Sequence, residues 1–178
     1  MKIFFFYFFR INFYAFFFCH SNIPLCDIYL ELIDTNNNIT KMKQFIEKII
    51  LKTKGSEILN ITKIVENMVK KSTINDGLLN LSILHTSCSL MIQENADPTV
   101  MSDIKNFLIK IAPEGNYLHD TEGSDDMPAH LKSLITQSNL TISIKNKEML
   151  LGTWQGIFLL EHRYHPKSRE LFFHILGE

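Results

Sequence analysis

The order in which strand-like and helix-like patterns follow one another constrains the fold of this chain most. Apolar and polar residues alternate with the two-residue period of half-buried strands over residues 79–83, 88–92 and 140–145. The mostly apolar segments over residues 154–160 and 171–176 indicate buried strands. Helix-like patterns lie among these strands but do not alternate with them regularly, as they would in a parallel α/β sheet. The sequence therefore predicts an α+β fold.

Two helices are marked by apolar residues at helical spacing and by signals at their ends. Residues 61–69 carry this spacing and predict the first helix. Asp97 suits the N-cap of the second helix, Pro98 its first position, and Pro113 ends it. One apolar stripe is predicted along this second helix, formed by Val100, Ile104, Phe107, Leu108 and Ile111.

A third, shorter helix is predicted to begin at Pro128, because proline suits the first helical position. Its apolar residues Leu131, Leu134 and Ile135 are expected to face the core. The sequence contains no internal repeat, no glycine-rich phosphate loop and no nucleophile-elbow motif, which argues against several common enzyme classes.

The first 37 residues differ from the rest of the chain and are predicted to lie outside the folded domain. Nine of the fourteen phenylalanines fall between Phe4 and Phe18. This apolar stretch is shorter than the roughly 20 residues that span a bilayer, and Arg10 interrupts it, so no stable membrane span is expected. Residues 1–37 are interpreted as a leader or targeting segment followed by an Asn-rich linker, and residues 38–178 as one domain. The compartment is cytoplasmic if the leader is unstructured, and organellar or secretory if it is a targeting signal.

The net charge and the cysteine content argue against two classes of protein. A formal net charge of −1 does not provide the basic surface that nucleic-acid binding usually needs. Three cysteines, without paired spacing, are too few for a disulfide framework or a structural zinc site. Cys88 is interpreted as a small buried residue rather than a nucleophile.

Residues 114–130 contain five carboxylates and two histidines but no lysine or arginine. Clustered carboxylates repel one another unless a positive charge lies among them. A divalent metal, Mg²⁺ or Zn²⁺, would supply that charge, and imidazole and carboxylate groups are suitable ligands. The predicted ligands are His85, His119, Asp125 and His130, on the condition that the fold brings the histidines together. The alternatives are an exposed acidic loop and a hydrogen-bonded, structural His85.

Further polar residues gather at two other places. Glu94 and Asn95 precede the helix cap and have no structural explanation of their own. Trp154, the only tryptophan, stands beside Gln155 between small residues, a pattern typical of a close backbone approach in a sheet. A position in the core is the alternative for the tryptophan.

Three blocks of residues together resemble the YjbQ family, also called UPF0047 or the secondary thiamine-phosphate synthase type. The blocks read HTSCSLMIQENADP from His85, YLHDTEGSDDMPAHLKS from Tyr117 and LGTWQGIFLLEHR from Leu151. The resemblance covers residues 38–178, and three ordered motifs at compatible spacing make it specific.

This resemblance implies a β-rich pseudobarrel or sandwich with a few helices packed on it, assembled as a homotrimer. It also implies a synthase that condenses a pyrimidine methyl diphosphate with a thiazole phosphate and releases pyrophosphate. The residues expected to be catalytic are His85, Glu94 and His130. The residues expected to bind substrate are Asn95, Trp154, Gln155, Arg163 and Arg169.

Two other functions fit the same residues. A bound metal that activates water would give a hydrolase of a small phosphorylated molecule. Binding without turnover would give a trimeric protein that holds a metal or an anion. Arg163 and Arg169 are expected to meet phosphate, and their alternative role is an ion pair with Glu161.

Overall fold

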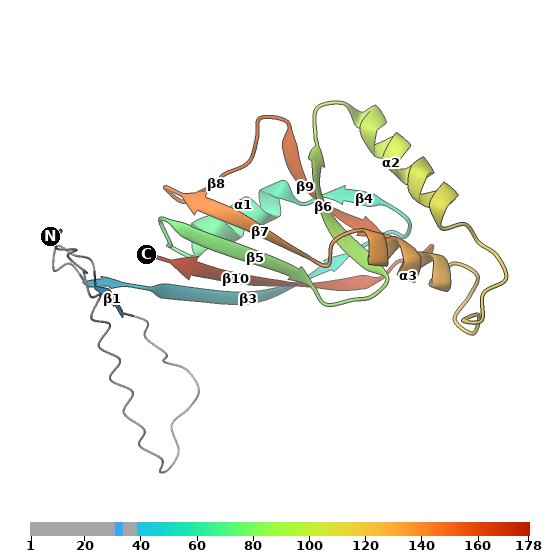
Figure 1. Cartoon of the computed structure of the whole chain (residues 1–178), viewed down its shortest axis with the longest axis horizontal. Helices are drawn as coiled ribbons and strands as arrows, with labels where there is room; N and C mark the ends of the chain where they lie inside the picture. The colour runs from blue at the N-terminus through green and yellow to red at the C-terminus, as the bar shows by residue number, and fades with distance from the viewer. Residues whose placement is uncertain (1–30, 34–38) are drawn as a thin grey trace, which may run out of the picture.

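The computed structural model describes residues 31–33 and 39–178, and Figure 1 shows how their strands and helices are arranged. The predicted leader and most of the linker lie outside the described residues. The first described strands, β1 (Glu31–Ile33) and β2 (Ile39–Lys41), pair with each other in antiparallel orientation. Among the helices of the described residues, none has the length and apolar character needed to cross a membrane.

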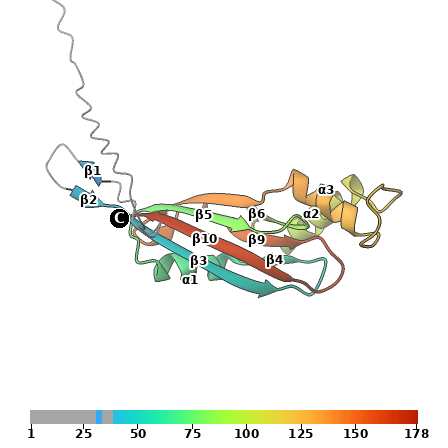
Figure 2. The ribbon, with the colours of Figure 1, turned by 90° about the horizontal axis from the view of Figure 1, so that it is seen from below.

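A five-stranded antiparallel sheet forms the larger part of the fold (Figure 2). The long C-terminal strand pairs on one side with the first long strand of the domain and on the other with the strand that follows the first helix. In spatial order the sheet consists of β3 (Lys43–Lys52), β10 (Ser168–Gly177), β5 (Gly77–Ile83), β7 (Asn139–Lys145) and β8 (Glu148–Met149).

A smaller antiparallel sheet contains β4 (Ile58–Asn60), β9 (Gln155–Glu161) and β6 (Cys88–Glu94) in that spatial order. In the register of β6 and β9, Glu94 lies opposite Gln155, and Cys88 lies opposite Glu161. The two antiparallel strands therefore begin and end level with each other. Residues next to Glu94 and Gln155 lie at one end of the pair, and residues next to Cys88 and Glu161 lie at the other.

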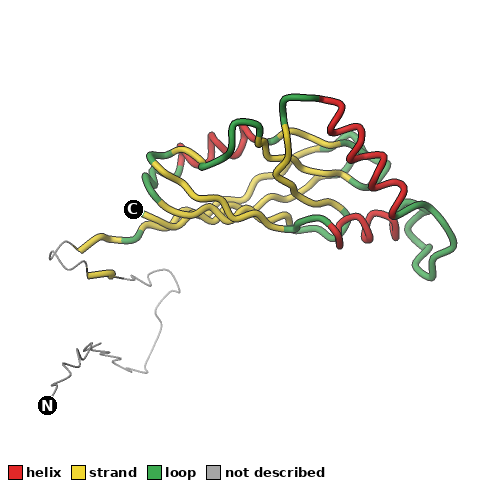
Figure 3. The backbone as a smooth tube through the Cα atoms, turned by 45° about the horizontal axis from the view of Figure 1, so that its top comes forward, coloured by secondary structure: helices red, strands yellow, loops and turns green. Residues whose placement is uncertain are grey.

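Within residues 39–178, three helices complete the α+β fold that the sequence predicts (Figure 3). Helix α1 (Thr62–Lys71) inserts Val65 and Val69 into the core that also contains Phe173 of the larger sheet. Helix α2 (Pro98–Ile111) begins as predicted, because the Asp97 carboxylate accepts a hydrogen bond from the Thr99 N–H at 2.8 Å. Helix α3 (Asp126–Ile135) packs beside the start of β6.

Two expectations about helix α3 are wrong. Helix α3 begins at Asp126, two residues before Pro128, and its Leu134 and Ile135 are 78% and 55% exposed rather than directed at the core. Of the stripe predicted along α2, only Leu108 is buried, while Phe107 is 58% exposed. Apolar side chains of both helices therefore face outward in this single chain.

Candidate metal centre

His119, Asp126 and His130 form a compact group at the start of α3. One carboxylate oxygen, Asp126 Oδ2, lies 2.7 Å from His119 Nε2 and 3.5 Å from His130 Nε2. Asp126 and His130 are four residues apart on the helix, a spacing that places both side chains on the same face. The three potential ligand atoms lie within 4.8 Å of one another. This geometry fits a metal ion bound by two imidazoles and one carboxylate.

Contacts outside this group orient two of its members. His130 Nδ1 lies 3.0 Å from the carbonyl oxygen of Thr86, and because a carbonyl only accepts, the ring nitrogen donates. When the His130 ring is neutral, its Nε2 carries a lone pair and faces Asp126 Oδ2. Two hydrogen-bond acceptors, Nε2 and Oδ2, then face each other. The other oxygen of Asp126, Oδ1, accepts a hydrogen bond from the Arg163 guanidinium. Such outer contacts are typical of metal ligands, whose tautomer and orientation they fix.

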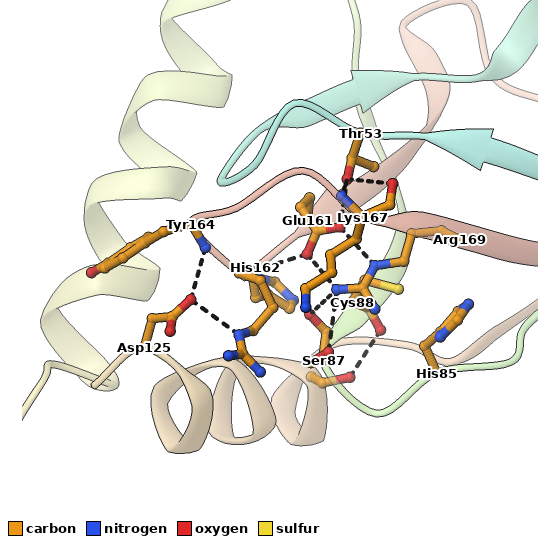
Figure 4. Close-up of polar contacts among 12 residues, drawn as sticks. Thr53, His85, Ser87, Cys88, Asp125, Glu161, His162, Tyr164, Lys167 and Arg169 are labelled. Carbon is orange, nitrogen blue, oxygen red and sulfur yellow. Dashed lines mark hydrogen bonds and ion pairs between the residues drawn. The ribbon is translucent and has the colours of Figure 1, made fainter. Parts of the chain in front are cut away.

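Arg163 holds the neighbouring acidic segment as well. Its Nε donates to Asp125 Oδ2 at 3.0 Å, and its Nη2 donates to the carbonyl oxygen of Glu122 at 2.8 Å. Burial by itself would raise the pKa of Asp125, but hydrogen bonds from the Tyr164 N–H and from Arg163 outweigh it and lower that pKa. Asp125 is therefore a buried anion of the arginine network (Figure 4).

Of the four residues predicted to bind metal, the structure brings together His119 and His130. Asp125 is engaged by Arg163 and Tyr164, and Asp126 takes its place beside the histidines. His85 is not a member of this group, and its Nε2 accepts a hydrogen bond from the Glu170 N–H at 2.8 Å. Burial, followed by the charge of Arg169, lowers the pKa of His85. This contact matches the structural alternative for that histidine.

Arg169 and Glu161 form a buried ion pair (Figure 4). Arg169 donates from Nε at 2.6 Å and from Nη2 at 2.5 Å to the two carboxylate oxygens, and Thr53 donates to the same carboxylate at 2.8 Å. Although burial opposes it, these donors hold the pKa of Glu161 below its usual range. The pairing that the sequence left open is thus between Glu161 and Arg169, with Arg163 directed to the aspartates.

Two buried groups next to this ion pair differ in how well the sequence predicted them. Cys88 is fully buried, and burial raises the pKa of its thiol to about 12, which confirms that it is not a ready nucleophile. The sequence assigns no role to His162, although it lies in a cluster of polar residues. It is also buried, lies 2.8 Å from Ser89 Oγ, and burial lowers its pKa to about 4, so it is neutral at pH 7. Its position between Glu161 and Arg163 was the one available signal.

Comparisons with known proteins agree with this fold. Residues 47–178 match the sequence model of the family described as UPF0047 protein YjbQ-like. The chain belongs to this YjbQ-like family. It is 43% identical over 138 residues to the UPF0047 protein sll1880 of Synechocystis sp., covering 76% of this chain and 94% of that protein. It is 41% identical over 128 residues to the UPF0047 protein YjbQ of Escherichia coli O157:H7, covering 71% and 92% of the two chains.

Solved structures of YjbQ-like proteins share the architecture. A YbjQ-like protein of unknown function from Sulfolobus solfataricus P2 superposes with a TM-score of 0.72 at 27% identity, over 77% of this chain and 99% of that chain. An uncharacterised conserved protein of the YjbQ/UPF0047 family from Clostridium acetobutylicum superposes with a TM-score of 0.67 at 35% identity, over 72% and 98%.

The remaining site residues expected of a YjbQ-like protein lie at the other end of β6 and β9. The N–H of Asn95 donates to the carbonyl oxygen of Trp154 at 2.8 Å, directly beyond the paired Glu94 and Gln155. Trp154 is 62% exposed, which excludes its alternative place in the core. Strand β6 rises about 20 Å over its length, at roughly 3.3 Å per residue, so these residues are well separated from His130. One site that contains all the expected residues does not form within this chain.

Proposed function

We propose that this protein binds one divalent cation, preferably Zn²⁺, through His119, Asp126 and His130, and hydrolyses a small phosphate ester there. The observation that carries the proposal is the convergence of Asp126 Oδ2 with two imidazole nitrogens, where outer contacts fix both His130 and Asp126. Three protein ligands leave a coordination position open for water or substrate, as in hydrolytic zinc sites. A bound cation would polarise a phosphoryl oxygen and lower the pKa of bound water.

The side chains around the centre have defined tasks in this proposal. Arg163 directs Asp126 Oδ2 toward the histidines and keeps the segment around Glu122 and Asp125 in place. The His119 side chain is 46% exposed, so a solute has direct access to the group. Because the group contains the carboxylate of Asp126, an anionic substrate depends on the cation to offset its charge.

The synthase reaction implied by the family resemblance is the second candidate. It would use the same cation to neutralise the leaving pyrophosphate. Basic side chains normally share that task, but Arg163 and Arg169 are both engaged by buried carboxylates. Hydrolysis needs fewer free cationic groups and is the better-supported function.

We also propose that the protein assembles as a homotrimer. Apolar side chains exposed on α2, α3 and the segment between them support this, because such groups are usually covered in an assembly. They include Phe107, Ile111, Leu118, Leu134 and Ile135. Sedimentation of the full chain tests this directly, and a monomer at micromolar concentration would contradict it.

The full chain, purified without chelator, tests the metal and the reaction together. Bound zinc and hydrolysis of p-nitrophenyl phosphate are measured for the wild type, His119→Ala, His130→Ala and the control His165→Ala. His165 is an exposed histidine outside the group. The expected result is one zinc per chain and hydrolysis in the wild type and the control, with both lost in the other two variants.

Other outcomes separate the candidates. Formation of thiamine phosphate from the two phosphorylated precursors, without hydrolysis of the ester, would favour the synthase. Zinc binding without either reaction would favour a non-catalytic metal-binding protein. Equal zinc content in all four proteins would contradict the proposed ligands.

A further inference from the structure

A cavity of about 430 Å³ lies at the end of the molecule opposite the histidine group. Figure 1 and Figure 2 place α1 at one end of the larger sheet, and α3 at the other. The cavity is lined by α1, by the β8 segment, and by Asn95 and Gln155 at the end where β6 and β9 lie level. Its volume lies within the range of small-molecule sites in proteins.

The lining of the cavity contains both apolar and cationic side chains. Val69, Met149 and Leu151 provide the apolar surface. Lys70 and Lys147 also line the cavity, and neither forms an ion pair within residues 39–178. Two lysines without carboxylate partners beside apolar surface suit a ligand with an apolar body and an anionic group.

Two carboxylates belong to the same lining and reduce its positive charge without cancelling it. Glu66 is already paired with Lys63, whose Nζ lies 2.9 Å from its carboxylate. Glu148 has no ion pair within the described part of the chain. Two unpaired lysines against one unpaired glutamate leave a net charge of about +1, which favours an anion over a cation.

Asn95 and Gln155 present side-chain amide groups elsewhere in the lining. Gln155 Oε1 accepts a hydrogen bond from the Gly152 N–H at 2.7 Å, which leaves its Nε2 hydrogens to donate to a ligand. Asn95 Nδ2 contacts the carbonyl oxygen of Gln155 at 3.5 Å, which leaves its Oδ1 to accept. Together they offer a donor group, Gln155 Nε2, and an acceptor group, Asn95 Oδ1, to a polar part of a ligand.

We propose that this cavity is a second binding site, separate from the metal centre, for a small organic anion. Lys70 and Lys147 bind its anionic group, and Asn95 and Gln155 bind a polar group elsewhere on the same molecule. The proposal gives a role to Asn95 and Gln155, which the metal centre leaves unused. It does not depend on the proposed hydrolysis, because none of its residues belongs to the histidine group.

The test uses the full chain labelled with ¹⁵N and two probes that cannot be hydrolysed, phenylphosphonate and 4-carbamoylphenylphosphonate. Titration in the presence of EDTA keeps the metal centre empty. The side-chain amide signals of Asn95 and Gln155 are expected to shift with the carbamoyl probe. Lys70→Ala and Lys147→Ala should each weaken binding about tenfold, the effect of losing a charge-assisted hydrogen bond.

Matched variants decide between the two sites. Lys110→Ala removes an exposed lysine of α2 and should leave the affinity unchanged. Gln155→Ala should abolish the preference for the carbamoyl probe, and His130→Ala should have no effect. Full affinity in a Lys70→Ala/Lys147→Ala double variant, or loss of binding in His130→Ala, would overturn the second site.

Discussion

His130 Nδ1 donates a hydrogen bond to the carbonyl oxygen of Thr86 across 3.0 Å, so the segment before β6 sets the tautomer of a histidine on α3. The ring presents Nε2 to Asp126 as a consequence. A main-chain carbonyl cannot rotate away as a side chain can, so this contact would hold His130 in the orientation that the proposed cation site needs.

Arg163→Lys tests whether the outer contacts matter for metal affinity. Lysine keeps the charge but cannot form the fork that joins Asp125 and Asp126, so zinc affinity should fall about 10–100-fold. Competition titration with a chromophoric chelator measures the change. Glu122→Ala is the control, because its carboxylate is exposed and 3.9 Å from the guanidinium. Equal affinities in folded Arg163→Lys and wild type would contradict the role given to the arginine.

The Glu161–Arg169 ion pair should be important for stability but not irreplaceable. Arg169→Met leaves a buried carboxylate without its partner and should lower the free energy of unfolding by about 3–5 kcal/mol. The double variant Arg169→Met/Glu161→Leu should recover a large part of this loss, because no buried charge remains. Urea unfolding measures both. A double variant less stable than Arg169→Met would show that the Glu161 carboxylate stabilises the fold more through its hydrogen bonds from Thr53 and the Arg163 N–H than through the ion pair.

His162 should make the fold less stable in mild acid. Its pKa is about 4 in the folded protein against 6.5 for a free histidine, so below pH 6.5 the unfolded chain takes up the proton first. Stability should fall as the pH drops from 6.5 to 4, by about 3 kcal/mol in total. His85, whose pKa is also lowered, adds to the same trend, whereas the loss from Glu161 comes at lower pH.

Comparison with His162→Gln isolates the contribution of His162, because the glutamine amide can take the position of Nε2 beside Ser89 without titrating. Thermal unfolding between pH 4.5 and 7 should show a shallower pH dependence in this variant than in the wild type and in His165→Gln. Identical slopes in all three proteins would mean that His162 is not buried as a neutral ring.

Gly55 should not tolerate alanine. Its φ of +99° is unfavourable for other residues, and an added Cβ would collide with the carbonyl oxygen of Tyr164, next to Arg163. Gly55→Ala should lower the free energy of unfolding by about 2–3 kcal/mol. Gly115→Ala, where a Cβ meets only Tyr117 at 3.9 Å, should change it by less than about 0.5 kcal/mol. Similar effects of the two substitutions in urea unfolding would contradict this.

Most of the fold could be predicted where one face of a strand is wholly apolar. In β7, buried Leu140, Ile142 and Ile144 alternate with exposed residues, as the sequence indicates. Strand β3 was not predicted as a strand because Ile46 and Ile50 place apolar residues on its exposed face and obscure the alternation. Periodicity reports burial only when the outer face is polar.

Only part of the candidate site could be predicted from the sequence, because the predicted start of α3 lies two residues too late. The acidic, histidine-bearing segment pointed to His119 and His130, but a helix beginning at Pro128 would not place Asp126 one turn before His130. The observed start at Asp126 creates that relation. The separation of Asn95 from the histidines depends on the register of β6 and β9, which no local pattern encodes.

A crystal structure of the zinc-loaded full chain, with anomalous data collected at the zinc edge, would show directly whether His119, Asp126 and His130 bind the cation. One strong anomalous peak is expected about 2.0–2.2 Å from His119 Nε2, His130 Nε2 and an oxygen of Asp126. A zinc-saturated protein with no peak at that position, or with its peak at His85 and Asp125, would contradict the proposed ligands.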